Sequence, residues 1–170
     1  MDEKIRNLLK PVSHDQMSGL WEKAKERDLQ GLDDDSQRLV KIMVDHEDEL
    51  YAQFEHADLT YDPELNPDPD YDPFLHISIH SVVEAQLDQN DPLEAVEFFN
   101  AMCRQKYSRH EAVHLIGQIL IYFVFDVVEN QKPFDQETYC KLLAKYKSRD
   151  PKELMDLLET EPLLSEPKNS

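Results

Sequence analysis

Apolar residues are most concentrated between residues 108 and 130, where the chain reads SRHEAVHLIGQILIYFVFDVVEN. After a polar first turn, only His114, Gln118 and Asp126 interrupt the apolar side chains. A helix that is apolar on every face is surrounded either by other protein elements or by lipid. A membrane span needs about 20 uninterrupted apolar residues, and this shorter stretch contains an aspartate. The pattern therefore predicts a central helix buried within the protein.

Apolar residues elsewhere recur at helical spacing, which predicts further helices around the central one. Two sequence patterns typical of helix amino ends precede them. Capping boxes are formed by Ser13 with Gln16 and by Ser108 with Glu111, and an Asp N-cap followed by Pro is found at Asp72-Pro73 and at Asp91-Pro92. The predicted helices span about residues 14–28, 33–54, 73–88, 92–107, 108–130 and 136–147, with a short one from residue 151. We therefore predict an all-α fold, an antiparallel bundle of six or seven helices around one central buried helix.

The length of 170 residues fits a single helical domain. Within it we expect residues 1–12 to be a charged lead-in, residues 57–72 an acidic, proline-rich loop, and residues 161–170 a frayed tail. The first residues lack the apolar core of a signal peptide, which predicts a cytoplasmic protein. In such a reducing compartment Cys103 and Cys140 are expected to be ordinary buried thiols.

The charge balance excludes several classes of partner. The chain has 36 acidic and 18 basic residues, a net charge of -18, which repels nucleic acids and anionic membranes over most of the surface. Only three glycines are present, which disfavours glycine-rich phosphate loops. We therefore expect neither a nucleic-acid-binding protein nor a membrane protein.

Two pairs of histidines carry the strongest chemical signal. His76 and His80 are four residues apart on one predicted helix, and His110 and His114 are four apart on another, so each pair projects from one helix face. One helix of similar length joins these two by short turns, so they should run parallel with both pairs at the same end. Four imidazoles could then bind one divalent transition metal ion, with zinc as the first choice and iron, nickel or cobalt as alternatives.

Three further residues are candidates for the same site. Glu84 continues the stripe of His76 and His80 by one turn, and Glu111 lies beside His110. Either carboxylate could move a proton if the ion activates water for hydrolysis. His46, within an apolar helical stripe, is a possible additional participant.

Other interpretations of these residues stay open. Histidines near helix starts often satisfy backbone groups or face solvent. The letters HEAVH also match the zinc-protease motif, but Glu111 is explained by its capping box, and Leu120 stands where the third histidine of the longer motif belongs. A different class of function is a non-catalytic interaction module, whose acidic surface would take a basic protein partner.

Four segments of the chain read HEDELY, DPFLHISIH, SRHEAVHLIGQIL and PFDQETY. Together they resemble a small bacterial family known as a domain of unknown function. The resemblance covers about residues 15–148, and its specific part is the two histidine segments. The sequence departs from the family pattern in having Asp72 where the family has asparagine, and in a longer acidic loop. The resemblance supports a bacterial cytoplasmic origin and implies no reaction or catalytic residue.

Overall fold

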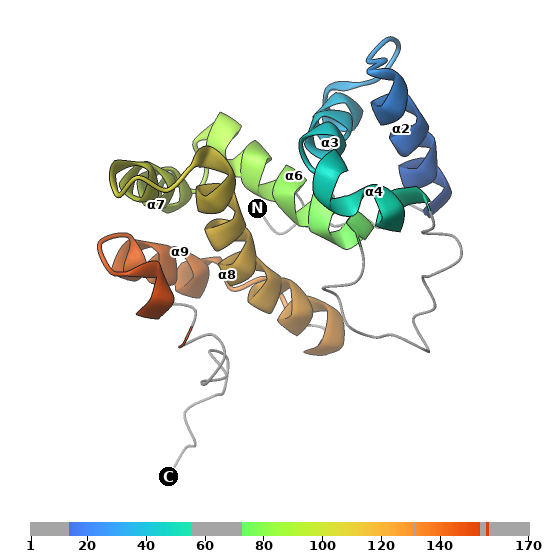
Figure 1. Ribbon diagram of the computed structural model, residues 1–170. Helices are drawn as coiled ribbons and strands as arrows, with labels where there is room; N and C mark the ends of the chain where they lie inside the picture. The colour runs from blue at the N-terminus through green and yellow to red at the C-terminus, as the bar shows by residue number, and fades with distance from the viewer. Residues whose placement is uncertain (1–13, 56–72, 131, 154–155, 157–170) are drawn as a thin grey trace. The chain divides into compact units, whose positions relative to one another are not determined.

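The structure is a computed structural model that describes residues 14–55, 73–130, 132–153 and 156. These residues form helices and contain no strand, which confirms the all-α prediction (Figure 1). The expected lead-in at 1–12, the acidic loop at 57–72 and the tail at 161–170 lie outside the described residues. The caps predicted at Ser13 and Asp72 lie outside them as well.

The described residues divide into two compact units, which we call unit 1 (residues 14–82) and unit 2 (residues 83–156). The division falls inside a helix, α6 (Pro73–Gln89), between Val82 and Val83. Each unit is described by itself. A single domain built around one central helix stays a prediction.

Unit 1 contains α2 (His14–Glu26), α3 (Asp34–Asp45), α4 (Glu47–Glu55) and the first half of α6. α2 packs against α3. The side chain of Asp33 caps α3 by accepting a hydrogen bond of 2.7 Å from the backbone N–H of Ser36. A carboxylate suits this place because the first N–H groups of a helix have no partner within it and carry partial positive charge.

One predicted helix is in fact two. The sequence pattern indicated a continuous helix through Phe54, but the chain breaks at His46, where φ is -104° and ψ is 6°. The His46 N–H still donates to Ile42, while its carbonyl accepts from the N–H of Leu50 at 2.9 Å, in the first turn of α4. Three acidic residues, Glu47–Glu49, open α4. They favour a new helix start over continuation, because acidic side chains stabilise the amino end of a helix.

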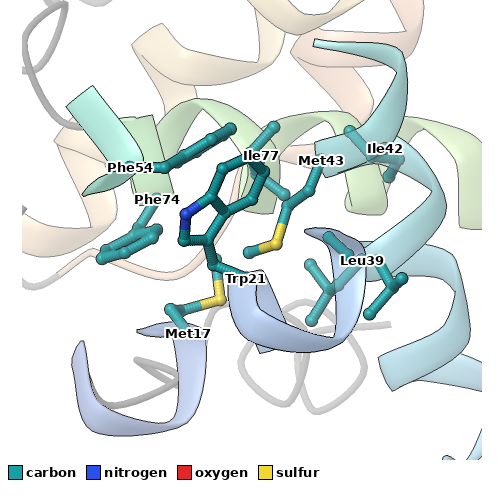
Figure 2. Packing of buried hydrophobic residues seen from close by; sticks show 10 residues of the cluster. Met17, Trp21, Leu39, Ile42, Met43, Phe54, Phe74 and Ile77 are labelled. Carbon is teal, nitrogen blue, oxygen red and sulfur yellow. The ribbon is translucent and has the colours of Figure 1, made fainter. Parts of the chain in front are cut away.

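Trp21 lies at the centre of the unit 1 core. Figure 2 shows its ring between Phe54 and Phe74 on one side and Met43 and Ile77 on the other. The ring centroids of Trp21 and Phe54 are 4.7 Å apart. The Trp21 indole N–H donates to the carboxylate of Glu55 at 2.8 Å, so the one polar atom of the ring has a partner. This core joins α6 to the helices that precede it within unit 1.

Unit 2 contains the second half of α6 with α7 (Leu93–Arg104), α8 (Arg109–Asn130) and α9 (Gln136–Tyr146). α7 packs against both α8 and α9. The predicted capping box of α8 is confirmed: the Ser108 N–H donates to the Glu111 carboxylate at 2.7 Å, and the Glu111 N–H donates to the Ser108 hydroxyl at 3.2 Å. At α7 the expectation of an Asp91 cap is wrong, because Pro92 takes the capping position without a side-chain hydrogen bond.

Most of the described side chains of α8 are buried or half-buried, whereas Arg109, Glu111 and Gln118 are exposed. Its Phe123 contacts Phe134 and Tyr139, with ring centroids 5.8 and 5.6 Å away. The expectation of two buried thiols is wrong for Cys103, which is exposed, whereas Cys140 is half-buried. Burial raises the pKa of the Cys140 thiol to about 11, and the negative charge of Glu94 adds to the shift.

Candidate metal centre

Unit 1 brings three histidines together, and we call His46, His76 and His80 the histidine cluster. His46 is supplied by the break between α3 and α4, and the other two by successive turns of α6. The His46 ring centroid is 5.0 Å from that of His76 and 4.5 Å from that of His80. The His76 and His80 rings are stacked at 4.7 Å, and the His46 ring meets each of them edge to face.

The histidine cluster is largely shielded from water. His46 is 1% exposed and His80 is 5% exposed, and His76 is half-buried. The helix turns that carry these rings also carry Ile42 and Ile77, which belong to the apolar core of unit 1. Buried imidazoles in such surroundings need hydrogen-bond or metal partners, since burying a polar group without one is costly.

The ring orientation of His46 follows from one hydrogen bond. Its Nδ1 lies 2.8 Å from the carbonyl oxygen of Ile42, in a buried contact. Because a carbonyl oxygen only accepts, Nδ1 carries the proton, and the lone pair of the neutral ring is on Nε2. A backbone carbonyl that fixes the tautomer in this way is a common support for a metal-binding histidine.

The spacing of the ring nitrogens suits a single ion. One nitrogen from each of the three rings lies within 4.8 Å of the other two. Tetrahedral zinc with bonds of about 2.0–2.1 Å separates its nitrogen ligands by about 3.4 Å. Side-chain rotations that move each nitrogen by about an ångström would therefore complete the coordination.

The predicted metal ligands fall into both units. His76 and His80 belong to the cluster in unit 1, whereas His110 and His114 form their own pair in unit 2, with ring centroids 4.3 Å apart. The convergence of both pairs on one ion stays a prediction. The sequence pointed to His46 as an additional participant only because it interrupts an apolar stripe. It pointed to no role for the Ile42 carbonyl, because backbone groups leave no residue-type signal.

Both predicted proton carriers lie in unit 2 and have structural partners there. The Glu84 carboxylate forms a bidentate ion pair with the Arg109 guanidinium, in which Arg109 Nη2 lies 2.5 Å from Glu84 Oε2. Glu111 is held by the α8 capping box, and the hydrogen bonds from the backbone and side chain of Ser108 lower its pKa. A lowered pKa makes the Glu111 carboxylate a weaker base. A catalytic role for either residue stays a prediction.

No helix among the described residues combines the length and apolar character needed to cross a membrane. The structure thus defines an all-helical protein with a buried histidine cluster at a helix break. Residues 14–145 match the family described as Domain of unknown function (DUF1841), and since this match spans more than half of the chain, the protein belongs to that family. No curated protein and no solved structure matches the chain. The membership confirms the resemblance to a family of unknown function, while the histidine segments and bacterial origin linked to that resemblance stay predictions.

Proposed function

We propose that this protein binds a divalent transition metal ion through His46, His76 and His80, with zinc as the first choice. The observation that supports the proposal is the buried contact of three imidazoles contributed by two separate parts of the chain. Imidazole suits zinc, iron, cobalt and nickel, whereas calcium and magnesium prefer oxygen ligands.

A site with three protein ligands leaves a coordination position for water. A zinc ion in such a site lowers the pKa of its bound water to about 7 and so supplies hydroxide near neutral pH. Metal-assisted hydrolysis is therefore the reaction class that we assign to the site. The sequence-based prediction that His110 and His114 supply further ligands is a separate part of the proposal, and the His114→Ala variant tests it.

Metal analysis of protein purified without an affinity tag tests the proposed binding. We expect stoichiometric transition metal in the natural chain and its loss in His80→Ala. Ser78→Ala is the matched control, because Ser78 lies on α6 between the two histidines and its hydroxyl donates to the Phe74 carbonyl at 2.7 Å. Metal retained by a folded His80→Ala protein would contradict the proposal. So would a natural chain that binds no zinc when zinc is added.

Removing the ion should also destabilise the protein. An ion that binds only the folded chain adds about 2.7 kcal/mol to the free energy of unfolding when its free concentration is about 100 times its Kd. A chelator should therefore lower the melting temperature of the natural chain and of Ser78→Ala. It should leave His80→Ala unchanged, and an equal shift in all three proteins would show that the chelator acts elsewhere.

A further inference from the structure

We infer that the metal ion takes a small anionic group, a carboxylate, as its remaining ligand, so that the substrates of this site carry such a group. This inference rests on the proposed metal site and specifies what that site binds. It follows from the charge of the ligand set and from the burial of the cluster.

The ligand set leaves the charge of the ion uncompensated. Among the described residues, the cluster contains imidazoles and neither a carboxylate nor a thiolate. The hydrogen bond from His46 Nδ1 to the Ile42 carbonyl fits a neutral ring with its lone pair on Nε2. Neutral imidazoles bring no negative charge, so a divalent ion among them keeps its full double positive charge.

Neighbouring acidic residues of unit 1 do not supply the missing charge. Glu47 follows His46 directly, but its carboxylate is ion-paired with the Arg27 guanidinium. Asp45, on the other side of His46, is exposed to solvent.

Burial makes this charge imbalance matter. The helix turns around the cluster contribute Ile42, Met43, Phe74 and Ile77 to the apolar core (Figure 2). An ion in such surroundings interacts more strongly with nearby charges than it would in water, and an unpaired buried charge is costly. An anion that coordinates the ion neutralises part of its charge and so offsets the cost of burying it. An anionic ligand should therefore bind more tightly than a neutral one of the same size.

The same burial limits the size of that anion. Two of the three rings are almost completely covered, at 1% and 5% exposure, while His76 is half-buried. Because the cluster is so largely covered, an azide ion or a single carboxylate group should fit it better than a bulky anion does.

Cobalt substitution of the full chain tests this inference. Cobalt(II) bound by imidazoles gives visible absorption bands that respond to a change of ligand. We expect azide and acetate to shift these bands in a saturable way at constant ionic strength. Perchlorate, which coordinates weakly, is the matched control and should leave the bands unchanged. The shift should be lost in His80→Ala and retained in Ser78→Ala.

The outcomes separate this inference from the proposed function. Cobalt bands that form but ignore azide and acetate would overturn the anion inference and leave metal binding intact. An equal response to perchlorate would overturn it too, because the effect would then be one of ionic strength. If only His114→Ala responds, the natural site is closed by a protein ligand and the inference is wrong. The absence of cobalt bands would overturn both proposals.

Discussion

The two units bury polar side chains in different ways. In unit 2 the Tyr139 hydroxyl donates to the Gln86 side-chain carbonyl at 2.9 Å, and both residues are buried. Burial raises the pKa of Tyr139 far above its ordinary value, so the hydroxyl stays neutral and keeps its proton for this bond. In unit 1 two buried histidines, His46 and His80, and the half-buried His76 instead face one another with rings of the same kind.

This difference separates a structural polar contact from a functional candidate. A donor and an acceptor of complementary chemistry, such as Tyr139 and Gln86, satisfy each other and hold α9 to α6 within unit 2. Three converging imidazoles have the same chemistry, and the ligand that several of them can share is a metal ion. Buried polar groups at active sites are arranged for a ligand, and those in a core for each other.

Truncating Trp21 at the centre of the unit 1 core should lower the free energy of unfolding more than any of the other substitutions below. Trp21→Ala deletes a ring that is 2% exposed and belongs to the apolar core of unit 1 together with Phe54 and Phe74. Replacing a buried aromatic residue by alanine costs about 3–5 kcal/mol of unfolding free energy, and we expect metal binding to be lost with it. Urea unfolding with metal analysis measures both effects.

Tyr51→Ala is the matched control for this change. Tyr51 also contacts the Trp21 ring, with centroids 5.6 Å apart, but its side chain is 47% exposed. We expect it to lower the unfolding free energy by less than about 1 kcal/mol. Equal losses in the two variants would mean that the Trp21 ring is not the centre of this core.

Breaking the polar pair of unit 2 should destabilise the fold without touching the metal. Tyr139→Phe removes the hydroxyl and leaves the buried Gln86 carbonyl without its donor, which should cost about 1–3 kcal/mol. Adding Gln86→Leu to this variant should recover part of the loss, because both polar partners are then gone. A change in metal content in Tyr139→Phe would contradict the separation of roles between the units.

The start of α8 offers a smaller, pH-dependent test of whether Glu111 is structural. Ser108→Ala should lower the free energy of unfolding by about 1 kcal/mol, as is usual for the loss of a helix-capping side chain. The pKa of Glu111 is lowered from 4.5 in the folded chain by the hydrogen bonds from Ser108. A lowered folded-state pKa means that the stabilisation by ionised Glu111 is present above 4.5 and is lost as the pH falls through the folded-state value.

The natural chain should therefore be more stable than Glu111→Gln at pH 7, and the difference should disappear in acid. Thermal unfolding across pH 3–7 measures this difference. A Glu111→Gln protein of unchanged stability but lost hydrolytic activity would instead support the catalytic role predicted from the sequence.

Breaking the ion pair of Glu84 should have the smallest effect. The side chain of Arg109 is 61% exposed and that of Glu84 is 15% exposed, and an ion pair with one partner in solvent contributes about 1 kcal/mol. Arg109→Gln should therefore lower the unfolding free energy only slightly and leave metal content unchanged. Chemical denaturation at low and high salt checks this, because high salt should erase the difference between the two proteins.

Local sequence patterns predicted the helices well. The α8 capping box is visible as Ser108 followed three residues later by Glu111, and the structure contains both of its hydrogen bonds. The prediction failed at His46, where the apolar stripe continues through a break between two helices. An apolar pattern with helical period shows which residues face the core. The pattern does not show where one helix ends, because a second helix that turns its apolar side to the same core continues it.

In the candidate metal site, too, local spacing predicted one part and tertiary packing decided the other. The sequence by itself determined the pairing of His76 with His80, because residues four apart on a helix are neighbours whatever surrounds the helix. Tertiary structure alone decided that His46 joins them, since packing of the α3–α4 break beside α6 within unit 1 depends on side chains distant in the sequence, Trp21 and Phe74 among them. Helical spacing is a local property of the backbone, whereas the approach of two helices is a sum of many weak contacts that no short motif records.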